Sequence, residues 1–127
     1  MERNTPAMQA VVIAVGVAAG QVVEAGNLAV ANANGFAVHG STALNLTYLG
    51  RFEKTVDNTN GADGDVQVEV KRKTAFKWKN SGDITQANLL DTCYIVDSET
   101  VAATDGAGSR SPGGVIVQVD DDGVWVE

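Results

Sequence analysis

Residues 66–79 read Val-Gln-Val-Glu-Val-Lys-Arg-Lys-Thr-Ala-Phe-Lys-Trp-Lys, and this stretch decides the fold. Valines alternate with polar residues in its first half, and Phe76 and Trp78 alternate with lysines in its second half. A period of two places one set of side chains on the core face of a β-strand and the other set in water. We therefore expect two strands, over 65–73 and 74–79, that pair with each other.

The remaining apolar runs are also short, and they stop at clusters of Gly, Asn, Asp and Ser that form turns. We expect further strands at 8–18, 21–24, 28–31, 36–38, 43–49, 51–56, 92–97, 114–120 and 124–126. The only helix we expect is one short turn over 86–90, capped by Asp83 or Thr85.

These patterns predict an all-β fold, a small antiparallel barrel or sandwich with at most one short helical turn and an extended N-terminal segment. A chain of 127 residues suits one domain with one core. We assign residues 1–19 to an N-terminal arm or apolar strand that is interfacial, and residues 20–127 to the β domain. The candidate core residues are Val66, Val68, Val70, Phe76, Trp78, Ile95, Val117 and Val119.

The apolar run at 7–19 has three interpretations. It contains one strongly polar residue, Gln9, and it is shorter than the ~20 residues that a membrane span needs. A signal peptide is the second interpretation, but Glu2 lies in the segment where such peptides are basic, and the run is rich in β-branched residues. We favour the third interpretation, a buried or interfacial strand.

Charge is unevenly distributed along the chain. The net charge is −7, yet residues 71–79 hold five basic side chains and no acidic one. An acidic protein is repelled by nucleic acid and by anionic lipid, so we expect neither a specific nucleic acid nor a membrane as partner. The basic strip better matches an acidic protein surface, such as another copy of this chain. Candidate interface residues are Lys71, Lys73, Lys77 and Lys79 for docking, and Val11, Val12, Ile13 and Val15 for an apolar clamp.

The basic strip also interleaves cations with aromatic residues, as single-strand binding platforms do. Strand geometry favours a different interpretation, because Phe76 and Trp78 share one face and Lys77 and Lys79 share the other. We expect the aromatic side chains in the core and the cations on the surface.

No motif in the sequence predicts catalysis. His39 is the only histidine and Cys93 the only cysteine, so a closed zinc site and an intrachain disulfide are both ruled out. Residues 57–65 are rich in Asp and Asn, but the EF-hand spacing fails, since Val68 stands where the bidentate Glu is required. We expect an exposed turn there, a buried inert thiol at Cys93, and no catalytic residue, cofactor or metal.

Six short motifs follow one another along the chain. They are Tyr48-Leu49-Gly50-Arg51-Phe52-Glu53, Gly64-Asp65-Val66, Tyr94-Ile95-Val96-Asp97, Thr100-Val101, Ser109-Arg110-Ser111-Pro112-Gly113-Gly114-Val115 and Gly123-Val124-Trp125-Val126. Their order and spacing resemble the small capsid cement, or head decoration, proteins of tailed bacteriophages, particularly those of Mu-like phages. The likeness covers residues 20–126.

The resemblance implies a non-enzymatic capsid protein, part of the virion and assembled in the cytoplasm of the host bacterium. Such proteins sit on the outside of the phage head, often as trimers, and clamp neighbouring subunits of the major capsid protein. We therefore expect a homotrimer whose partner is the major capsid protein. The family has no catalytic residues to transfer to this chain.

Two alternatives stay open at the level of sequence. One is another phage structural module, a tail or baseplate component, which would share this composition. The other is a secreted carbohydrate-binding β-sandwich, which would need exposed aromatic side chains on one face. The aromatic residues of this chain lie mostly in alternating core patterns.

Overall fold

The computed structural model describes residues 1–127 and confirms the all-β prediction, since its only helical element is a single 3-10 turn. The strands are β1 Val12–Gly16, β2 Val22–Val23, β3 Leu28–Ala31, β4 Ala37–His39, β5 Thr47–Phe52, β6 Val56–Asp57, β7 Gln67–Lys71, β8 Phe76–Asn80, β9 Thr92–Ile95, β10 Thr100–Ala102, β11 Pro112–Asp120 and β12 Gly123–Val126. The 3-10 turn, η1, spans Gln86–Asn88.

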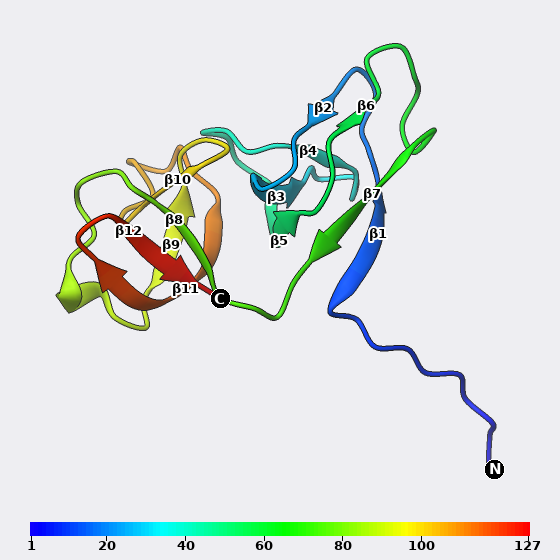
Figure 1. Ribbon diagram of the computed structural model, residues 1–127, viewed down its shortest axis with the longest axis horizontal. Coiled ribbons are helices and arrows are strands. Elements are labelled where there is room, and N and C mark those ends of the chain that lie inside the picture. Colours follow the sequence, from blue (N-terminus) through cyan, green and yellow to red (C-terminus); the bar gives the residue numbers. More distant parts are fainter.

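The strands form two halves that lie next to each other (Figure 1). The first half is a five-stranded sheet in the order β1-β7-β5-β3-β4, with the two-stranded ribbon β2-β6 beside it. The second half is a closed barrel in the order β10-β8-β12-β11-β9. All strand pairs are antiparallel except β8 with β10. The chain therefore contains both an open sheet, in its first half, and a closed barrel, in its second half.

Each half has its own hydrophobic cluster, where the sequence predicted one core. The barrel cluster contains Phe76, Trp78 and Ile95, and the sheet cluster contains Val68 and Val70. Strand β3 belongs to both clusters because its side chains alternate. Leu28 and Val30 pack into the barrel cluster, whereas Ala29 packs into the sheet cluster. All four residues of β3 are consequently buried, and the two halves share one strand as their common wall.

The predicted pairing of 65–73 with 74–79 is wrong. β7 pairs with β1 and β5, whereas β8 pairs with β12 and β10. Between them the chain crosses from the sheet to the barrel over residues 72–75, which Figure 1 shows as the green segment that joins the two halves. Alternation identifies each strand and its core face, but it does not identify the partner strand.

The predicted core residues are buried or packed against a core, with one exception. Val66 packs against the sheet cluster beside Val68 and Val70, and Val119 packs against the barrel cluster. Val117 belongs to neither cluster, because the register between β11 and β12 shifts between Ile116 and Gln118. This bulge inserts one extra residue into β11, so the set of side chains that points into the core changes at that point. Ile116 is therefore the fully buried side chain of β11.

Polar contacts join the two halves. Ser111 is buried, and its hydroxyl donates to Ala43 O (2.7 Å) while its Oγ accepts from Leu46 N–H (3.0 Å). Leu28 N–H donates to Ser98 O in the turn between β9 and β10 (2.9 Å). The Trp78 indole N–H donates to the Tyr48 hydroxyl (3.1 Å), which connects β8 to β5. Buried polar groups with satisfied hydrogen bonds fix the relative position of the sheet and the barrel.

Other departures from the predicted elements are local. β10 was not predicted, and β5 runs through Gly50 without a break. The predicted turn over 86–90 is the shorter η1, with Thr85 as the residue that precedes it. None of the helical structure in this protein is long and apolar enough to cross a membrane.

Candidate functional site

The N-terminal nine residues form an arm, defined here as residues 1–9, that extends away from the folded body (Figure 1). Every residue of the arm is exposed, and none makes a hydrogen bond to the rest of the chain. Its side chains include the exposed Met8. Residues 12–16, which sequence analysis grouped with the arm, are strand β1 of the sheet. The predicted segment 1–19 therefore contains a free arm and an integral edge strand.

The four predicted clamp residues divide between two environments. Ile13 and Val15 pack against the sheet cluster of their own chain. Val11 and Val12 are exposed, with 40% and 47% of their surfaces accessible. The exposed side chains of this region are thus Val11 and Val12, together with Met8 of the arm, whereas Ile13 and Val15 are half-buried.

β1 is the edge of the five-stranded sheet, and its outer backbone groups are open. Arg72 N–H donates to Val11 O (2.8 Å), and Val17 N–H donates to Val66 O (2.9 Å). These bonds show that the backbone N–H and C=O groups of the odd-numbered residues in this segment point toward β7. The N–H and C=O groups of Val12 and Ala14 consequently point away from the sheet, as in an edge strand that can accept another strand.

The four predicted docking lysines do not form one face. Lys77 and Lys79 lie on β8 of the barrel, and both have acidic partners. The Lys77 ammonium donates to Asp122 and lies 3.6 Å from Asp120, and these contacts raise the pKa of Lys77. Lys79 Nζ lies 2.8 Å from Glu99 Oε2, which raises the pKa of Lys79.

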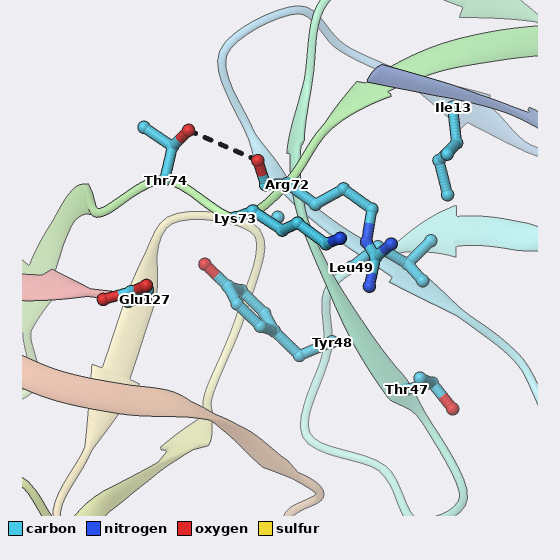
Figure 2. Close-up of a pocket in the computed structure, with 9 residues that line it drawn as sticks. Ile13, Thr47, Tyr48, Leu49, Arg72, Lys73, Thr74 and Glu127 are labelled. Atoms are coloured by element: carbon cyan, nitrogen blue, oxygen red, sulfur yellow. Dashed lines mark hydrogen bonds between the residues drawn. The ribbon is translucent and has the colours of Figure 1, made fainter. Parts of the chain in front are cut away.

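Lys71 is instead the last residue of β7, and Lys73 lies at the crossing between the halves, so that the two lysines flank Arg72. Arg72, Lys73 and Thr74 line a groove of about 680 Å³ together with Ile13 of β1, residues 47–50 of β5 and Glu127. Figure 2 shows the Arg72 and Lys73 side chains pointing toward the Leu49 side of this groove. We call it the cationic groove.

Two unusual backbone conformations shape the cationic groove. Lys73 has a φ of +56°, a left-handed conformation that is uncommon for residues other than glycine. Gly50 has a φ of +139°, and a Cβ atom there would lie 2.1 Å from Lys71 O, so β5 approaches the backbone of β7 closely at this point. Sequence analysis did not single out Arg72 or Gly50, because their roles depend on which strands become neighbours.

The polar side chains of the Asp- and Asn-rich stretch 57–65 make hydrogen bonds both within the loop and to residues 17–19. Asp63 accepts from Ala19 N–H (2.8 Å), and Asp65 accepts from Ala62 N–H (2.8 Å). Asn58 is buried, and its amide donates to Val17 O (3.1 Å) and Ala62 O (2.9 Å). No group of three or more His, Cys, Asp or Glu residues in the chain has a metal-binding arrangement. The acidic side chains serve as turn acceptors, and Asn58 anchors the loop to the chain after β1.

Cys93 and His39 have separate environments. Cys93 is fully buried in the barrel cluster, and burial raises the pKa of its thiol to about 12. His39 lies on β4 in the sheet, and its Nδ1 is 2.9 Å from Gln21 Oε1. The prediction of a buried thiol is confirmed, and a thiol with a raised pKa is a poor nucleophile.

The seven aromatic side chains, Phe36, Tyr48, Phe52, Phe76, Trp78, Tyr94 and Trp125, are all buried or half-buried. Phe76 and Trp78 pack on each other with ring centroids 6.0 Å apart, as the alternation of their strand predicts. Trp125 is half-buried, and Lys77 Nζ lies 5.9 Å from the centroid of its ring.

Comparisons of the chain with protein-family models, with curated proteins and with solved structures gave no match.

Proposed function

We propose that this chain is a non-enzymatic cement, or decoration, protein that binds the outer surface of a tailed-phage head and stabilises the lattice of the major capsid protein. The observation that carries the proposal is the free arm continuing from an open edge strand. Residues 1–9 are exposed, and β1 presents unpaired backbone groups directly after them. The motif order described above supports the same assignment.

An arm and an open edge are what a molecular clamp needs. An extended segment adds to the sheet edge of another protein through backbone hydrogen bonds, and side chains such as Met8 provide specificity. The body must stay rigid while the arm engages, and the shared strand β3 and the contacts of Ser111 provide that rigidity. Repetition over many sites of a shell makes even a modest interface effective.

The proposed partners follow from this assignment. The protein acts as a homotrimer on the major capsid protein, with no nucleic acid or membrane as specific partner. It resides in the virion, on the exterior of the head, after assembly in the host cytoplasm. A tail or baseplate component is the competing assignment, and the experiment below separates the two.

The test uses heads from the phage or prophage that encodes this chain, prepared without the protein. Purified protein is added, and electron cryomicroscopy measures density on the outer surface. Dye fluorescence on heating reports the temperature at which the heads release DNA. We expect added protein to decorate the heads and to raise that temperature. Undecorated heads with unchanged release, or density on tails alone, would overturn the proposal.

A further inference from the structure

Three consecutive cations, Lys71, Arg72 and Lys73, lack an acidic partner in this acidic protein. The other cations of the sheet and of β8 all have one, in the pairs Arg51–Glu53, Lys54–Glu69, Lys77–Asp122 and Lys79–Glu99. A run of like charges repels itself, and a net charge of −7 offers many acidic residues that could have neutralised it. The unpaired run therefore marks a place where the charge is available to a partner.

The cationic groove combines two of these charges, Arg72 and Lys73, with an apolar floor. Ile13 and Leu49 line the groove as half-buried residues that pack against the sheet cluster, so apolar surface beside that cluster is open to solvent here. Arg72 and Lys73 line the same groove, and Glu127 lies at its other end without an ion pair to either cation (Figure 2). A ligand that fits must carry negative charge next to apolar groups.

The backbone at the groove is held in an unfavourable conformation. Lys73 has a φ of +56°, and such conformations persist where the surrounding structure enforces them. A glycine at this position would avoid the cost, but it would also remove the charge. The turn that contains Lys73 places this residue in the lining of the groove beside Arg72.

We propose that the cationic groove binds an extended segment of the major capsid protein that carries one or two carboxylates beside an apolar side chain. This inference rests on the proposed function. The Arg72 guanidinium offers the planar fork that pairs with a carboxylate through two hydrogen bonds, and Lys73 supplies a second point charge. The apolar neighbour of the carboxylate covers Ile13 and Leu49. A polyanion such as nucleic acid fits less well, because it would extend over the acidic body.

The first experiment measures the affinity of the protein for heads at several salt concentrations. The groove variants are Lys73→Gln alone, which leaves the Arg72 contact to Ala10 O in place, and Arg72→Gln/Lys73→Gln. The matched control is Lys54→Gln/Lys79→Gln, which removes the same charge from exposed lysines outside the groove. We expect the double groove variant to bind about tenfold more weakly at low salt, with a shallower salt dependence, and the control to stay within about twofold of wild type.

The outcomes separate the two proposals. Wild-type protein that fails to bind heads contradicts the proposed function. If wild-type protein binds heads and the groove variants bind as tightly as the control variant does, the groove proposal is contradicted and the proposed function is not.

The second experiment needs no heads. Peptides that tile the major capsid protein of the same phage are immobilised, and wild-type protein and the double groove variant are compared. We expect wild-type protein to bind acidic peptides and the variant to lose that binding. Tighter binding of single-stranded DNA than of acidic peptides of equal charge would overturn the proposal. Light scattering that shows a loss of self-association only in the groove variants would also overturn the proposal, because a second copy of this chain would then occupy the groove.

Discussion

At the scale of single residues, Asn58 has a structural role that its loop position did not suggest. Its buried amide donates to carbonyls of the chain that follows β1, and to Ala62 O within the loop. Asn58→Ala removes these three side-chain hydrogen bonds from a buried site, while each carbonyl keeps a backbone donor. We expect the free energy of unfolding to fall by about 1–3 kcal/mol. Asn60→Ala is the control, since Asn60 is exposed in the same loop. Urea denaturation measures both, and equal stability of the two variants would contradict the role of Asn58.

Two buried titratable residues predict a loss of stability at alkaline pH. Burial raises the pKa of Cys93 and of Tyr48 to about 12. In the unfolded chain Cys93 loses its proton near pH 8.5 and Tyr48 near pH 10. Between these values and pH 12, the folded state therefore binds more protons than the unfolded state. The stabilisation is fully present below about pH 8.5 and is lost as the pH rises toward 12.

Cys93→Ala provides the measurement. We expect the stability of the variant to decline less steeply than that of wild type above about pH 8.5, where each proton contributes at most about 1.4 kcal/mol per pH unit. Denaturant unfolding between pH 7 and 11 gives both curves. Parallel curves would show that the thiol titrates normally in the folded protein.

At the scale of elements, Gly50 lets β5 pass close to β7. Gly50→Ala introduces both an unfavourable φ and a clash with Lys71 O, whereas Gly82→Ala introduces an unfavourable φ of +119° in open space. We expect Gly82→Ala to cost about 1–2 kcal/mol and Gly50→Ala to cost clearly more, because the clash adds to the conformational term. Thermal unfolding compares the two variants. A Gly50 variant no less stable than the Gly82 variant would mean that β5 moves away from β7 at little cost.

Elements also show the limit of prediction from pattern. The alternation of residues 66–79 identified two strands and their core faces, including the burial of Phe76 and Trp78. It did not reveal that β7 and β8 belong to different halves, because both arrangements satisfy the same alternation. The bulge at Val117 escaped prediction for a related reason, since a bulge depends on the register with β12.

At the scale of the whole molecule, the structure separates an exposed arm, residues 1–9, from an edge strand that packs on the sheet. Deleting residues 1–9 removes only exposed chain, so we expect the melting temperature to stay within about 1 °C of wild type. Deleting residues 1–19 instead removes β1 and the buried Val17. That variant should be strongly destabilised or fail to fold.

The short deletion therefore tests the proposed trimer without the complication of unfolding. We expect light scattering to show weakened self-association of the protein that lacks residues 1–9, and reduced decoration of heads. Unchanged mass and unchanged decoration would show that the arm is not the clamp.

The sequence alone determined the fold class, most of the strand faces and the buried thiol, because alternation, turn chemistry and apolar neighbours are local properties. The tertiary structure decided how the strands are partnered, and with that the division into sheet and barrel and the sharing of β3. It also decided which lysines are neutralised, since Lys77 and Lys79 meet acidic residues that lie far away in the sequence. Electrostatic partners depend on distance in space, so only the folded chain could separate the paired lysines of β8 from the unpaired cations of the groove.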